Sequence, residues 1–78
     1  MKRLKKDVDL IAFLNAVSLC SADVMFQTED GDSLNLKSAL SKYLFSMVAT
    51  NQRYILTGEV LCRLDEDYHY LKEYVYEG

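Results

Sequence analysis

The only histidine of the chain, His69, follows three consecutive acidic residues at positions 65–67. Imidazole and carboxylate groups are side chains that bind divalent cations or transfer protons. Consecutive residues of a helical turn point in different directions, however, so one histidine beside these carboxylates makes poor ligand geometry. We therefore expect His69 to face solvent, and we expect neither a metal site nor a cofactor.

No other group of residues has the pattern of a catalytic site. A serine or cysteine nucleophile needs a base within hydrogen-bonding reach, and the chain offers only His69. The three glycines are isolated from one another, so the chain has no glycine-rich loop of the kind that holds phosphates. We predict that the protein is not an enzyme. Its 78 residues also exclude a large cofactor-binding enzyme.

The chain has two cysteines, Cys20 and Cys62, and their spacing matches no metal-binding or disulfide framework. We expect reduced thiols, as is usual in the cytoplasm, with a single disulfide as the alternative.

Residues 29–32, Glu-Asp-Gly-Asp, resemble a fragment of a calcium-binding loop, but the other ligands of such a loop are missing. Because Asp-Gly readily adopts positive φ angles, these residues predict a hairpin turn.

The first half of the chain predicts a helix followed by this hairpin. A helix over residues 8–19 is indicated by apolar residues spaced three and four apart, at Leu10, Phe13, Leu14 and Val17. Asp7 or Asp9 can cap its first turn. From residue 23 the period changes to two, which predicts a strand to residue 28 and a return strand over 33–36.

The second half predicts a helix, a strand and a last helix. For the helix over 37–48, which Ser33 or Asn35 can cap, the expected buried face comprises Leu36, Leu40, Tyr43, Leu44 and Met47. Residues 54–64 predict a strand in which Gly58 marks a bulge or bend. The acidic residues 65–67 suit the first turn of the last helix. Its expected buried stripe comprises Leu64, Tyr68, Leu71 and Val75. The fold class is α+β, with helices packed on one face of a small antiparallel sheet.

This order of elements resembles the histidine-containing phosphocarrier protein (HPr) family of the bacterial sugar phosphotransferase system. The matching residues run from Phe13 to Val17 and from Ser21 to Phe26, and continue through the turn at Gly31 to residues 36–40, Leu-Lys-Ser-Ala-Leu. The resemblance covers about residues 8–48 well and the rest by pattern alone. It implies a single HPr-like domain over residues 1–78, an open-faced sandwich of three helices on one face of the sheet.

The chain lacks the segment that carries this family's chemistry. The phosphoacceptor lies in Gly-Leu-His-x-Arg-Pro before the first helix, whereas residues 1–8 contain neither histidine nor proline. Asp7 and Asp9 would also repel a phosphoryl group at that helix end. We therefore predict that the chain is not a phosphocarrier at the family's site. Ser38 falls where many members carry a regulatory phosphorylation serine, and the alternative is an unmodified serine that caps the helix.

Charge is distributed unevenly along the chain. Nine basic and twelve acidic residues give a net charge of −3, which excludes a general nucleic-acid binder. Four basic residues lie in the first six positions, so residues 7–78 carry five basic against twelve acidic residues, a net charge of −7. Acidic residues separate this basic start from the apolar run that follows, and no run approaches the ~20 residues that span a bilayer. We expect a cytoplasmic protein without membrane contact.

Tyrosines gather near the end of the chain, where four of the six lie between residues 68 and 76. Tyr70 and Tyr74, four residues apart, are candidates for an interface with another protein, because tyrosine gives a large contact area at low entropic cost. The strand near 57–63 is expected to have a free edge, which residues 1–6 could cover as a short charged strand or a second copy could pair in a homodimer.

We expect a non-catalytic HPr-like binding or regulatory module whose protein partner is unknown. The alternatives are a phosphoryl carrier with a relocated histidine, and a small-ligand sensor whose pocket is lined by Cys20, Cys62 or the tyrosines.

Overall fold

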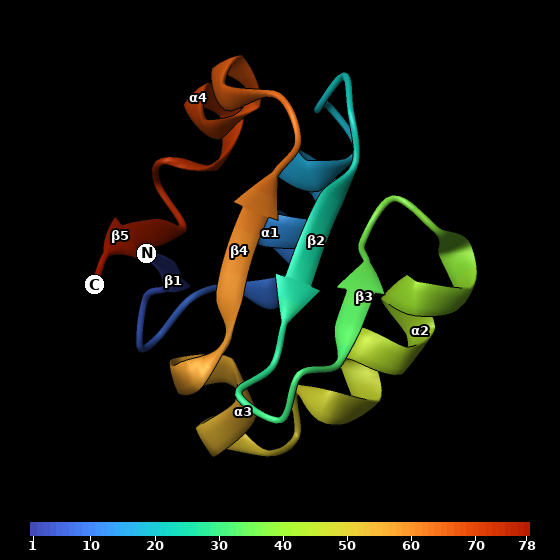
Figure 1. Ribbon diagram of the computed structural model, residues 1–78, viewed down its shortest axis with the longest axis vertical. Coiled ribbons are helices and arrows are strands. Elements are labelled where there is room, and N and C mark those ends of the chain that lie inside the picture. Colours follow the sequence, from blue (N-terminus) through green and yellow to red (C-terminus); the bar gives the residue numbers. More distant parts are fainter.

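The computed structural model describes the backbone of residues 1–78 and every side chain except that of Val48. Two small antiparallel sheets form the strand layer (Figure 1). The larger sheet has the order β3-β2-β4, with β2 at Val24–Gln27, β3 at Ser33–Asn35 and β4 at Glu59–Cys62. The smaller sheet pairs β1, Lys2–Leu4, with β5, Val75–Glu77. The predicted α+β class is confirmed.

Four α-helices surround the strands. They are α1 at Leu10–Val17, α2 at Ala39–Val48, α3 at Gln52–Thr57 and α4 at Tyr68–Leu71, the last preceded by a 3-10 turn, η1, at Asp65–Asp67. In Figure 1, α1 lies behind the larger sheet and α2 lies beside β3. The two termini lie close together at the opposite side, where β1 meets β5.

The first helix and the hairpin form as the sequence predicts. Asp9 caps α1, since its Oδ1 accepts a hydrogen bond from the backbone N–H of Ala12 at 3.1 Å. The turn between β2 and β3 is closed by Gly31, whose φ of 93° is one that side chains other than glycine rarely adopt. Phe26 pairs with Leu34 of β3 and with Val60 of β4, so β2 is the central strand of its sheet.

Residues 52–57 form a helix, which corrects the prediction of a strand that begins at residue 54. Asn51 caps α3 by accepting a hydrogen bond from the N–H of Arg53 at 3.0 Å. Arg53 also makes an ion pair with Glu29 at 2.7 Å, which ties α3 to the turn of the β2–β3 hairpin. This local cap and the ion pair favour the helix over the strand that periodicity indicated.

The last predicted helix is also shorter than expected. It ends at Leu71, and residues Val75–Glu77 form β5. Val75 is buried, as predicted, but as a strand residue that pairs with Leu4. Val75–Glu77 form a strand because they pair with a strand at the other end of the chain. Such long-range pairing cannot be predicted from the local periodicity of the sequence.

Three phenylalanines form the centre of the core. Phe45 of α2 packs against Phe26 of β2 with ring centroids 5.0 Å apart, and against Phe13 of α1 with centroids 6.2 Å apart. All three rings are fully buried. The Phe26 ring also covers Gly58, where a Cβ atom would overlap Cζ, Cε1 and Cε2 of that ring.

We predict that Gly58→Ala destabilises the fold by about 2–3 kcal/mol through overpacking. Its φ of −74° and ψ of 156° suit alanine, so the cost comes from the Phe26 ring alone. Urea unfolding of the single variants and of the double variant with Phe26→Leu measures this coupling. The double variant should be more stable than the sum of the two single effects predicts, by about 1 kcal/mol. Additive effects of the two substitutions would contradict this account. Gly31→Ala is the control: it costs stability through backbone strain, so combining it with Phe26→Leu should not reduce that cost.

Candidate functional site

Ser38 is the N-cap residue of α2. Its backbone is extended, and its Oγ accepts a hydrogen bond from the N–H of Ser41 at 3.5 Å. The structure thus has Ser38 as the cap, which is the alternative to phosphorylation considered for this residue, and not Ser33 or Asn35. Asn35 instead accepts a hydrogen bond from the N–H of Lys37 at 3.0 Å. Within the described structure the Ser38 hydroxyl thus has a structural role.

The two candidate interface tyrosines line one hollow of about 580 Å³ between α1 and the α4 segment, together with His69. Tyr70 lies in α4 and is exposed, whereas Tyr74 follows the helix and is half-buried against Phe13, with ring centroids 6.2 Å apart. The structure brings the two tyrosines to the same hollow, although they do not share a helix.

His69 is exposed, as predicted, and its ring packs beside that of Tyr70 with ring centroids 5.7 Å apart. Of the three acidic residues before it, Asp67 is buried, whereas Asp65 and Glu66 are exposed. Among the residues that the structure describes, no group of three histidine, cysteine, aspartate or glutamate side chains is placed to hold a metal ion.

Asp67 connects the end of η1 to the loop that precedes β2. Its two carboxylate oxygens accept hydrogen bonds from the backbone N–H groups of Ser21 and Ala22, each at 2.9 Å. From the sequence, Asp67 is expected only to be one of three acidic residues in the first turn of the last helix. Its contact with Ser21 and Ala22 could not be predicted, because the two segments are more than forty residues apart. Its role is to hold the loop between α1 and β2.

We predict that Asp67→Asn destabilises the fold by about 2 kcal/mol, because an amide can accept from only one of the two N–H groups and presents its own donors to the other. Chemical denaturation measures the loss. Asp65→Asn, a matched change at an exposed neighbour, should alter stability by less than about 0.5 kcal/mol. Equal effects of the two substitutions would show that the buried contact is unimportant.

The two cysteines are free thiols, Cys20 buried and Cys62 half-buried. Burial raises the pKa of the Cys20 thiol, and the nearby Asp67 carboxylate raises it further. Burial is also the main reason why the pKa of Cys62 rises to about 12, with Cys20 the next cause. Both thiols are therefore protonated at neutral pH, which does not suit a nucleophile or a metal ligand.

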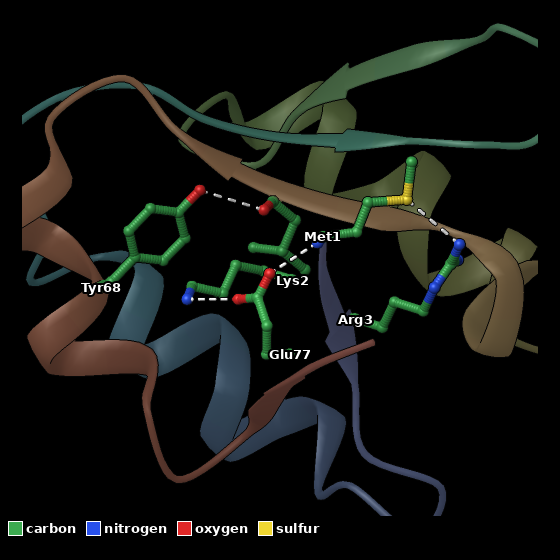
Figure 2. A network of polar contacts seen from close by, with 6 residues as sticks. Met1, Lys2, Arg3, Tyr68 and Glu77 are labelled. Carbon is green, nitrogen blue, oxygen red and sulfur yellow. Dashed lines mark hydrogen bonds and ion pairs between the residues drawn. The ribbon is translucent and has the colours of Figure 1, made fainter.

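The two chain ends are joined by ion pairs (Figure 2). Glu77 of β5 accepts from the amino group of Met1 through Oε1 and from Lys2 Nζ through Oε2, each at 2.6 Å. The backbone N–H of Gly78 also donates to the carbonyl oxygen of Met1 at 2.8 Å. Lys2, one of the basic residues at the start of the sequence, thus stabilises the pairing of β1 with β5.

The outer edge of β4 is occupied by side chains. The Tyr68 hydroxyl accepts a hydrogen bond from the N–H of Cys62 at 3.0 Å and donates to the carbonyl oxygen of Val60 at 3.3 Å, the second of which Figure 2 shows. Arg3 Nη1 of β1 donates to the carbonyl oxygen of Thr57 just before β4. These contacts cover much of the edge that the sequence led us to expect to be free.

Glu77 makes the stability of the fold depend on pH. The hydrogen bond from Lys2, followed by that from the N-terminal amino group, lowers the pKa of Glu77 from 4.5 to about 2. A carboxyl whose pKa is lowered on folding stabilises the fold above its unfolded pKa, and this contribution is lost as the carboxylate is protonated.

We predict that the stability difference between the wild type and Glu77→Gln is largest at neutral pH and shrinks as pH falls from about 4.5 to about 2. Urea midpoints over this range measure it, with Glu73→Gln, an exposed residue outside the ion pairs, as the control. Because Glu77 is exposed, added salt should also reduce the difference. A difference that stays constant down to pH 2 would contradict the assignment.

The outward face of α2 is the largest departure from the predicted structure. The residues expected to face the core are instead exposed: Leu40 by 69%, Tyr43 by 66%, Leu44 by 41% and Met47 by 58%. We call these four residues the α2 seam. Of the predicted face only Leu36, which precedes the helix, is buried, and among the described side chains of α2 only Phe45 is buried.

Two hollows flank α2, and only the first of them borders the α2 seam, whereas the second lies on the opposite side of the helix. One, of about 460 Å³, lies between α2, the hairpin and α3, and its apolar lining includes Leu34, Leu44, Met47 and Tyr54. The other, of about 320 Å³, lies between α2 and α1, and its lining is Leu10, Ile11, Leu14, Phe45, Ser46 and Ala49. Ile11 of α1 is itself an exposed apolar residue. An apolar helix face bordered by an apolar hollow, as the α2 seam is by the 460 Å³ one, is typical of a surface that binds another protein.

Comparisons with known protein families, with characterised proteins and with solved structures find no match for this chain. In the described part of the chain, no helix is long and apolar enough to cross a membrane. The geometry of the chain itself is therefore the basis for a functional proposal.

Proposed function

We propose that this chain is a non-catalytic HPr-like binding module that docks a protein partner on the α2 seam. The observation that carries the proposal is the exposure of four large apolar side chains at positions i, i+3, i+4 and i+7 of one helix. On a helix this spacing makes a single apolar stripe, which is the face that a helix normally buries. A stripe left in water costs free energy unless a partner covers it.

The order of elements over residues 8–48 supports the HPr-like part of the proposal. Helix α1 ends at Val17, β2 follows, a glycine turn at Gly31 returns the chain, and the pair Lys37-Ser38 leads into α2. These are the features on which the resemblance rests. The additional helix α3 and the strand β5 lie in the second half of the chain, where the resemblance is one of pattern alone.

The chemistry of the remaining residues supports a role without catalysis. Asp9, at the start of α1, uses its carboxylate to cap that helix, which leaves an anion where the family places its phosphoacceptor. The only histidine stands on α4, beside Tyr70. Both thiols are buried or half-buried with raised pKa values. A binding role needs none of these groups to react.

A photo-crosslinking amino acid at position 43 of the full chain tests the docking role. We expect it to form an adduct with one protein species in the native cell extract, identified by mass spectrometry, and an excess of unlabelled wild-type chain should suppress that adduct. The same probe at Lys6, an exposed residue outside the α2 seam, is the control. Adducts at position 43 that are no more abundant than those at position 6, or that wild type does not suppress, would contradict the proposal.

A further inference from the structure

We infer that the partner of the α2 seam is a second copy of this chain, docked helix against helix in antiparallel orientation about a twofold axis. This inference rests on the docking role proposed for α2 and names its occupant. Three properties of the face support it: its area, its shape and its charge.

The exposed area suits a small homodimer. A fully exposed large apolar side chain presents roughly 150–200 Å². The exposed fractions of the four residues therefore correspond to about 400 Å² of apolar surface per copy, or about 800 Å² for two copies. Because apolar atoms make up about 60% of such interfaces, the complete interface would bury about 1,300 Å². Stable interfaces bury about 1,200–2,000 Å², so two seams together with the polar surface around them reach the lower end of this range.

The shape of the face is self-complementary when one helix is reversed. Leu40 and Tyr43, the two most exposed residues of the α2 seam, lie in the first half of the helix and line neither hollow. Leu44 and Met47, in the second half, line the 460 Å³ hollow. An antiparallel pair places the first half of each helix against the second half of the other, so the protruding residues of each copy meet the hollow of its partner. A twofold interface requires this kind of surface, which carries both parts of the contact.

The charge of the face also favours a second copy. The α2 seam contains no charged residue, and Lys42 is the only charged residue of α2. Two copies can therefore meet without opposing rows of like charges. A helix that binds a lipid surface instead usually carries several lysines or arginines on its polar face, which α2 does not.

Sedimentation analysis of the wild-type chain is the first test. Over a concentration series spanning roughly two orders of magnitude, we expect the mass to rise from that of the monomer to twice that value. Leu40→Glu and Met47→Lys should each raise the dissociation constant of the dimer by about 30-fold or more. Both residues are exposed in the single chain, so circular dichroism and thermal unfolding should show that each variant folds.

The two variants together test the orientation. In an antiparallel pair, Glu at position 40 of one chain faces Lys at position 47 of the other, so an equimolar mixture should form a mixed dimer more tightly than either variant forms its own. Tyr76→Lys, at an exposed tyrosine on β5, is the matched control that should leave the dissociation constant unchanged. A mixture that associates no better than the separate variants would overturn the antiparallel arrangement.

Two further outcomes would overturn the inference as a whole. One is a wild-type chain that stays monomeric at every concentration. The other is a dimer that Tyr76→Lys disrupts and Leu40→Glu does not, which would place the interface at the β5 edge. If the chain is monomeric while a crosslinker at position 43 captures a different protein, this inference fails and the proposed docking role stands. If neither occurs, both fail.

Discussion

The position of α2 depends on the insertion of Phe45 between Phe13 of α1 and Phe26 of β2. Edge-to-face and tilted contacts of this kind stabilise a fold by roughly 0.5–1.5 kcal/mol beyond the burial of area. A helix turns by about 100° per residue, so positions 43 and 47 lie about 200° from position 45 around the helix axis. Burying Phe45 therefore forces Tyr43 and Met47 to the opposite side, and the α2 seam cannot face the core at the same time.

Contacts between distant segments hold the rest of this small domain together. Asp67 fixes the loop before β2 through two backbone N–H groups, and Glu77 joins the two ends of the chain. Tyr68 occupies backbone groups at the edge of β4 where another strand could otherwise pair. These contacts leave the α2 seam as the extended apolar helix face that the described fold does not use.

The parts of the fold that could be predicted are those specified by neighbouring residues. Helix α1 has its own cap in Asp9 and a regular apolar face, and the hairpin has its own turn residue in Gly31. The strand β5 could not be predicted from its own residues, because it forms by pairing with β1 more than seventy positions earlier. Helix α3 was missed because a short apolar run suits either a strand or a helix, and the Asn51 cap decides the outcome.

The proposed binding surface could be predicted only in part. The sequence contains the stripe at Leu40, Tyr43, Leu44 and Met47, and the ordinary interpretation of such a stripe is a buried face. A single phenylalanine on the other side of the helix outweighs it, and periodicity does not show which of two apolar faces the core will accept. The tyrosine pair at Tyr70 and Tyr74 remains a second predicted interface, now placed at one hollow between α1 and α4.

The most direct test of this account compares two aromatic rings of α2 in solution. Paramagnetic relaxation caused by a soluble, uncharged probe reports how far each ring proton lies from solvent. At a concentration where the chain is monomeric, we predict strong relaxation of the Tyr43 ring and almost none of the Phe45 ring, because the first is exposed and the second fully buried. A shielded Tyr43 ring beside an exposed Phe45 ring would mean that α2 is rotated and that the α2 seam belongs to the core.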